Sequence, residues 1–260
     1  MTCKNCRERL EEEFHFCPIC GARIVNERIT FRSLIGQFTG WILNLDNSLV
    51  RTFKGMLVHP EKVIGAYIGG VRKKYMSPLS FLTIAISLAG LMVFIMQRLY
   101  QGQIDFTMGA EEINPEFSQA WTDIMFDYNA FFFVVYLPIL ALPAYLFMNR
   151  VNYNFAEQIV VFAYTLSQWI ILSFPFNLTS LLISTETYLS FNQIGSILAL
   201  AFCLYVLQRL NGYGFGSMIG RSVLFLLLAV VLFFMLIGSI MGLLFLTGIL
   251  DLESLKPPAA

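Results

Sequence analysis

The sequence predicts an all-α integral membrane protein in which five transmembrane helices follow a small four-cysteine module and an amphipathic helix. Three observations predict this fold class: the composition, two closely spaced cysteine pairs, and a helical period of apolar residues before the first long apolar run. The 260 residues are 57% hydrophobic and 13% charged, whereas soluble domains are about 25% charged. One soluble core cannot bury so many apolar side chains, so we expect much of the chain to lie in a lipid bilayer.

The cysteine motifs lie at the N-terminus. Cys3 and Cys6 form one C-x-x-C pair, and Cys17 and Cys20 form a second after ten intervening residues. Each pair turns the backbone so that both thiolates face one point, and four thiolates at one point form a tetrahedral Zn²⁺ site. We therefore expect a zinc-ribbon-like module at residues 1–26, with iron or two disulfides as the alternatives. A four-cysteine shell has no open position, so the site is expected to fold a recognition module and not to catalyse.

Residues 29–75 are predicted to form interfacial helices. Apolar residues from Phe31 to Leu57 follow the 3.6-residue period, with polar residues on the other side. This pattern is typical of an amphipathic helix in the cytosolic interface; packing on the protein's own domain is the alternative. The pair His59-Pro60 ends this helix, and a second, short helix runs to Gly69-Gly70. The cations that follow, Arg72, Lys73 and Lys74, are expected to lie at the membrane surface.

Residues 79–250 are predicted to form the five-helix transmembrane domain, and residues 251–260 a short C-terminal tail. Each span is an apolar run of roughly membrane-crossing length. The expected spans are Leu79–Gln97, Ala130–Met148, Gln158 to about Phe176, Ile194 to about Leu207, and Ser222 to about Leu250.

The distribution of cations predicts the orientation. Twelve lysines and arginines lie between Lys4 and Lys74, and the connection from Tyr100 to Asn129 contains acidic residues but no cation. With the N-terminus in the cytosol, fifteen of the seventeen cations fall on the cytosolic side, as the positive-inside rule requires. We expect a multi-pass protein of the cytoplasmic (inner) membrane with its C-terminus on the extracytoplasmic side. The absence of an apolar run at the N-terminus predicts no cleavable signal peptide.

Polar residues at the start of the third span have two interpretations. Asn154 and Glu157 have the spacing of a helix N-cap and an N3 carboxylate that reaches back to it. Alternatively, Glu157, Gln158 and Gln168 line a polar pocket among the second, third and fourth spans. In the fifth span, Gly238 and Gly242 form a G-x-x-x-G pair that permits close helix packing, either within the chain or with a second copy in a homo-oligomer.

Several motifs together resemble a family of bacterial polytopic membrane proteins of unknown function, common in Bacteroidota, that carry an N-terminal zinc knuckle pair. They are the paired C-x-x-C, the helix Ile29–Leu57 with His59-Pro60, the block Gly69–Pro78, and the stretch from Leu137 to Phe162. Family members often have Glu-His where this chain has Glu157-Gln158, a departure that removes a titrating imidazole. The five-span plan also resembles the Yip family of membrane-trafficking proteins. The resemblance implies a fold and a compartment but no reaction.

These observations favour a non-enzymatic membrane adaptor or scaffold whose zinc module recruits a cytosolic protein to the bilayer. The alternative is a transporter or lipid-handling protein for a small molecule or lipid, which uses the polar pocket. No catalytic or nucleotide-binding motif is present, and we expect no nucleic-acid partner.

Overall fold

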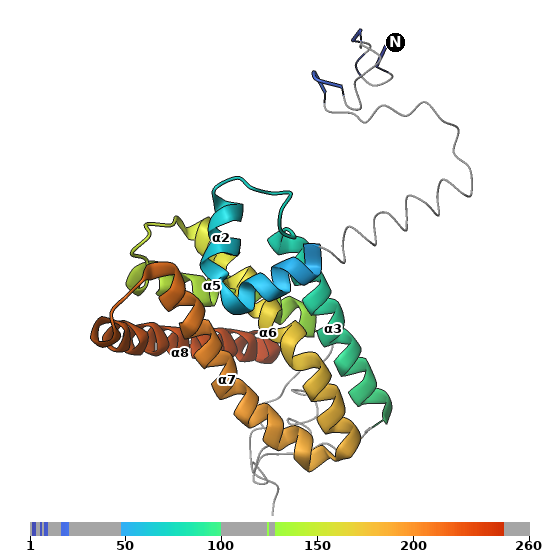
Figure 1. Ribbon diagram of the computed structural model, residues 1–260. Helices are drawn as coiled ribbons and strands as arrows, with labels where there is room; N and C mark the ends of the chain where they lie inside the picture. The colour runs from blue at the N-terminus through green and yellow to red at the C-terminus, as the bar shows by residue number, and fades with distance from the viewer. Residues whose placement is uncertain are drawn as a thin grey trace, which may run out of the picture. The chain divides into compact units, whose positions relative to one another are not determined.

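The computed structural model describes residues 48–99 and 128–246, together with Ile124 and nine residues near the N-terminus (Thr2, Cys3, Cys6, Glu8, Arg9 and 17–20). The chain divides into two compact units, Met1–Asp46 and Asn47–Ala260. Residues 29–47, which include most of the predicted amphipathic helix, and residues 100–123 of the acidic connection lie outside the described residues. Figure 1 shows the described helices.

The larger unit begins with residues 48–58, which are helical, and α2 (Pro60–Ile68). Pro60 occupies the first turn of α2, where its missing N–H costs nothing. The two helices approach closely at Gly55, because a Cβ there would lie 2.6 Å from Val63 Cγ2. His59-Pro60 therefore separates the two helices at the predicted place.

Five long helices follow, and each is long and apolar enough to cross a membrane. This confirms the predicted fold class of an all-helical protein with five candidate spans. They are α3 (Pro78–Leu99), α5 (Asn129–Phe147), α6 (Phe155–Ile183), α7 (Thr185–Asn211) and α8 (Phe215–Leu246).

The connection between the third and fourth spans is shorter than the sequence suggested. Ser184 alone separates α6 from α7, and its hydroxyl accepts a hydrogen bond from the Thr187 amide as the N-cap of α7. Thr179 and Ser180 lie in α6, and their hydroxyls donate to carbonyls of the preceding turn: Thr179 Oγ1 to Pro175 at 2.9 Å and Ser180 Oγ to Asn177 at 2.9 Å. The predicted spans ending near Phe176 and starting at Ile194 are therefore too short.

Helix α6 is the centre of the larger unit. It packs against α3, α5 and α7, and α2 lies against α6 and α7. In Figure 1, α3, α6 and α7 run side by side, whereas α8 crosses behind α7. The rings of Phe162 and Phe225 stack between α6 and α8, 6.3 Å apart. Helix α8 is unbroken over its 32 residues and is inclined to its neighbours.

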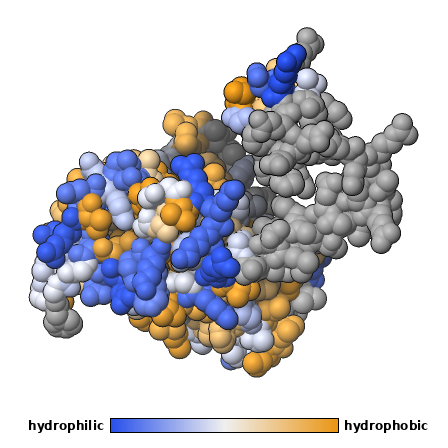
Figure 2. All heavy atoms as spheres, turned by 45° about the horizontal axis from the view of Figure 1, so that its top comes forward, coloured by the Kyte–Doolittle hydropathy of each residue, from blue (hydrophilic) through white to orange (hydrophobic). Residues whose placement is uncertain are grey.

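The outer helices expose most of their apolar side chains. Within the span windows, 6% of α7 and 11% of α8 are buried, compared with 39% of α6. A Cβ added to Gly238 or Gly242 would meet no atom within 4 Å, so no described helix packs against the G-x-x-x-G pair. Figure 2 shows hydrophobic residues over the sides of this unit and hydrophilic residues gathered over the face that carries α2. This distribution suits a bilayer around the sides.

Candidate functional sites

The four N-terminal cysteines form one cluster. Their sulfur atoms all lie within 4.8 Å of one another. The Cys3 and Cys20 sulfurs are 3.7 Å apart, and those of Cys6 and Cys17 are 3.6 Å apart. A tetrahedral ion with metal–sulfur bonds of about 2.3 Å requires sulfur separations of about 3.8 Å. The cluster thus has the size of a four-thiolate metal site, and none of these cysteines is in a disulfide.

The local backbone explains why the sulfurs converge. Thr2 and Arg9 form an antiparallel bridge, and the Cys3 amide donates to the Glu8 carbonyl at 2.8 Å, which closes a turn around the first pair. Residues 18–20 form the second turn. Cys3 and Cys17 are buried, while Cys6 and Cys20 are exposed. Each C-x-x-C pair therefore contributes one buried and one exposed sulfur.

Neighbouring groups set the pKa of the Cys6 thiol. The backbone amide of Glu8 lowers the pKa of the Cys6 thiol, but desolvation and the neighbouring sulfurs of Cys20, Cys17 and Cys3 outweigh it and raise the pKa to about 12. Thiolates are the metal-binding form of cysteine, and four of them at this distance repel one another unless a cation lies between them. A divalent ion that prefers sulfur ligands fits this donor set.

Cations gather at one end of the larger unit, which we call the α2 end. It comprises residues 48–77, residues 148–157 and residues 209–221. Two carboxylates, Glu61 and Glu157, lie there among the described residues. Nine of the ten lysines and arginines described in this unit lie at the α2 end, and Arg98 lies at the other end; the nine are Arg51, Lys54, Lys62, Arg72, Lys73, Lys74, Arg150, Arg209 and Arg221.

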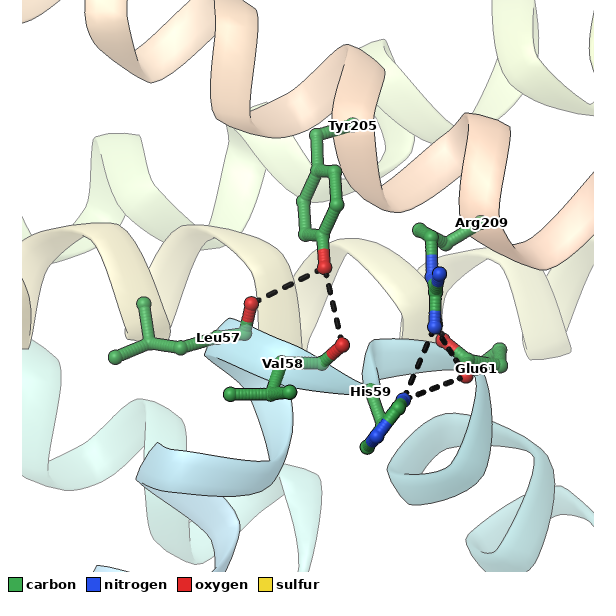
Figure 3. Close-up of polar contacts among 6 residues, drawn as sticks. All are labelled: Leu57, Val58, His59, Glu61, Tyr205 and Arg209. Atoms are coloured by element: carbon green, nitrogen blue, oxygen red, sulfur yellow. Dashed lines mark hydrogen bonds and ion pairs between the residues drawn. The ribbon is translucent and has the colours of Figure 1, made fainter.

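Arg209 connects α7 to α2 (Figure 3). Its guanidinium donates to both carboxylate oxygens of Glu61, at 2.8 and 3.1 Å, and lies 3.0 Å from His59 Nδ1. Next to it, the Tyr205 hydroxyl donates to the Leu57 and Val58 carbonyls at 3.1 and 3.2 Å. These contacts pair one of the two carboxylates with a cation of a distant helix, a pairing that no sequence motif signals.

The predicted basic cluster, Arg72, Lys73 and Lys74, is exposed and lies three residues before α3. The Arg72 guanidinium lies 5.8 Å from the centre of the Tyr67 ring, and the Lys74 ammonium lies 5.3 Å from that of Tyr75. Cations and aromatic rings at the start of an apolar helix are typical of a membrane surface.

The three residues of the predicted polar pocket lie in different surroundings. Glu157 caps α6: its carboxylate accepts from the Asn154 amide at 2.8 Å, while the Asn154 side chain accepts from the Glu157 amide at 2.9 Å. Gln158 is buried and donates to Asn149 Oδ1 at 3.1 Å. Gln168 is fully buried, and neither of its amide atoms has a hydrogen-bond partner.

The helical rise separates Gln158 from Gln168 by about 15 Å along α6. The structure therefore confirms the capping box and places Gln158 and Gln168 apart. Gln158 supports the segment that joins α5 to α6, whereas Gln168 is an isolated polar group in the middle of a span.

These features define a multi-pass membrane protein with a compact four-cysteine cluster and a cationic end. Residues 46–90 match a family model described as a protein of unknown function (DUF3667). The match includes residues 48–58, α2, the basic cluster and the first half of α3, and so agrees with part of the resemblance seen in the sequence. No curated protein and no solved structure matches the chain. These comparisons lend no support to a bacterial source or to the likeness to the Yip family.

Proposed function

We propose that the protein is a non-enzymatic membrane adaptor, in which the four-cysteine module holds Zn²⁺ and recruits a cytosolic protein partner to the bilayer. The observation that carries the proposal is the four-sulfur cluster. All four cysteines would ligate the ion, so no position is left for a substrate or a catalytic water. Five apolar helices on the same chain supply the anchor.

The module also presents an apolar side chain to its surroundings. Ile19 lies between the two ligands of the second pair, and 70% of its surface is exposed. A turn that displays an isoleucine next to a closed metal site is a suitable contact for a partner, because apolar side chains are common at the centre of interfaces.

The proposed orientation has the module and the α2 end on the cytosolic side and the C-terminus on the other side, in the cytoplasmic membrane. The gathering of nine cations at the α2 end supports this orientation through the positive-inside rule.

Two variants of the full chain separate metal binding from recruitment. In Cys17→Ser, Cys20→Ser the zinc content measured by elemental analysis should fall from one ion per chain to none. Ile19→Asp keeps all four sulfurs, so it should keep the ion but lose the partner in quantitative cross-linking from cells. Cys203→Ser is the matched control, because this cysteine lies in α7 outside the cluster, and it should change neither quantity. Unchanged partner recovery in both module variants would contradict the adaptor function.

A transport or lipid-handling function is a second candidate, and Gln168 is the observation that favours it. A fully buried amide without partners lies within a helix that could cross the membrane, and polar groups at such positions often mark a pathway. Under this function, Gln168→Leu should abolish transport while the zinc content and the recovered partners remain unchanged. Uptake or lipid-transfer assays in reconstituted vesicles would provide that comparison.

A further inference from the structure

A pocket of about 770 Å³ opens at the α2 end between the last turn of α5, residues 148–154, and the start of α8. We call it the arginine pocket. Its size is that of a site for a small organic ligand. None of its lining residues is acidic, and the residues that matter here are Tyr145, Leu146, Asn149, Arg150, Asn152 and Arg221.

Two arginines give the pocket its charge. Arg150 Nη1 donates to the Gly212 carbonyl at 3.2 Å, and Arg221 Nη1 donates to the Phe147 carbonyl at 2.8 Å. The Arg221 guanidinium also lies 4.7 Å from the centre of the Tyr213 ring. These contacts orient both side chains and use only part of their donors, since each guanidinium has five N–H groups. In the part of the chain that the structure describes, neither arginine is paired with a carboxylate.

Asparagines also line the pocket. The Asn149 side chain donates to the Tyr153 carbonyl at 2.7 Å and accepts from the Tyr153 amide at 2.8 Å and from Gln158. Asn152 lines the pocket with a left-handed backbone at φ 58°. Glu157 is the nearby carboxylate, but it turns to the Asn154 amide and is not part of the lining. The pocket thus offers two oriented positive charges and neutral amides.

Bidentate donors in this arrangement match the oxygens of a phosphate group. The apolar rim indicates where that phosphate comes from. Tyr145 and Leu146 belong to the span of α5, are 41% and 55% exposed, and line the same pocket. An amphiphile can therefore place its phosphate on the arginines and its chains along α5.

We propose that the arginine pocket binds the phosphate of an anionic phospholipid headgroup from the leaflet at the α2 end. Basic pockets between membrane helices bind such headgroups through the same chemistry. A free phosphate ester offers the same oxygens without the acyl chains, so the two sources must be compared directly.

The experiment measures lipid retention by the full chain in detergent, using native mass spectrometry with phosphatidylglycerol and phosphatidylcholine as probes. The wild type should retain phosphatidylglycerol in preference to phosphatidylcholine. Arg150→Gln, Arg221→Gln should reduce the retained phosphatidylglycerol roughly tenfold, since both phosphate contacts are lost. The matched control is Lys73→Gln, Lys74→Gln, which removes the same charge at the same end but outside the pocket; it should change retention less than about twofold.

A second variant covers the case in which the double arginine variant fails to fold. Asn152→Asp adds a negative charge to the pocket wall and leaves both arginine hydrogen bonds in place, and aspartate also accepts the left-handed backbone. It should reduce phosphatidylglycerol retention as well.

Three other results would overturn the proposed lipid site in whole or in part. Equal losses in the arginine and lysine variants would show diffuse attraction and overturn the site, as would equal retention of the two lipids by the wild type. Glycerol 3-phosphate that binds in the same assay and displaces the lipid would keep the phosphate site but overturn the lipid as its source.

Discussion

The hydrogen bond from Tyr164 to Met76 provides a direct test of how α6 holds the basic cluster in place. The Tyr164 hydroxyl in α6 donates to the Met76 carbonyl at 2.6 Å, and both residues are buried. On the other side, the Met76 amide donates to Thr52 Oγ1 at 2.9 Å. Met76, the second residue after the basic cluster, is thus fixed from two helices, and Tyr164→Phe removes one of the two contacts.

The expected cost follows from what the substitution leaves behind. Phenylalanine keeps the ring and its contacts with Tyr67 and Phe81, at centre distances of 6.0 and 6.1 Å, so little packing is lost. The Met76 carbonyl, however, stays buried, and no other described group donates to it. A buried acceptor without a partner costs about 1–3 kcal/mol. We therefore expect Tyr164→Phe to lower the free energy of unfolding by about 1–3 kcal/mol.

Equilibrium unfolding of the detergent-purified chain, followed by circular dichroism in mixed micelles, measures this difference. Tyr145→Phe is the matched control, because that tyrosine is 41% exposed and its hydroxyl has no described hydrogen bond; it should change the free energy by less than about 0.5 kcal/mol. Equal changes in the two variants would refute the inference that the hydroxyl anchors Met76.

Three further predictions concern packing, buried polarity and pH. Gly55→Ala places a Cβ against the buried Val63 and should destabilise the protein by about 1–3 kcal/mol. Gly220→Ala, where α8 is open, should stabilise the protein by about 0.5–1 kcal/mol. Higher stability of both variants would contradict the close approach at Gly55. Gln168→Leu removes two unpartnered polar atoms and should raise the free energy of unfolding by about 1–3 kcal/mol in the same assay, and a loss instead would mean that the amide has a partner. Burial raises the pKa of Glu61, but the hydrogen bonds and charge of Arg209 outweigh burial, so the net pKa is lowered. We therefore expect the wild type to be more stable than Glu61→Gln above the unfolded pKa of about 4.3. This difference should disappear as the pH falls through the lower folded pKa. A stability difference that stays constant as the pH falls below the unfolded pKa would contradict that assignment.

Local signals explain how much of the architecture could be predicted. Long apolar runs identify α3 and α5 within one or two residues, because lipid requires a continuous apolar helix of fixed length. The capping box at Asn154 and Glu157 was also predictable, since its hydrogen bonds join residues three positions apart. The cysteine spacing predicted the cluster for a similar reason.

The same local signals were misleading where a polar segment can form either a loop or part of a helix. The third span was expected to end near Phe176, but α6 continues through Thr179 and Ser180 to Ile183, and the hydroxyls of these two residues donate to the preceding turn. The sequence also missed the arginine pocket, because Arg150 lies between α5 and α6 whereas Arg221 lies in the second turn of α8. The asparagine-rich run Asn149–Asn154 was the one available signal for it.

The sequence by itself determined that the chain is helical, that five segments are apolar enough to cross a membrane, and that four cysteines can share one ion, because hydropathy, helical period and ligand spacing act over a few residues. Only the tertiary structure decided that Arg209 pairs with Glu61, that Tyr164 holds Met76, and that Arg150 and Arg221 share a pocket. These pairs are separated by 71 to 148 residues in the chain. Their contacts depend on how the helices pack around α6, and no local pattern specifies that packing.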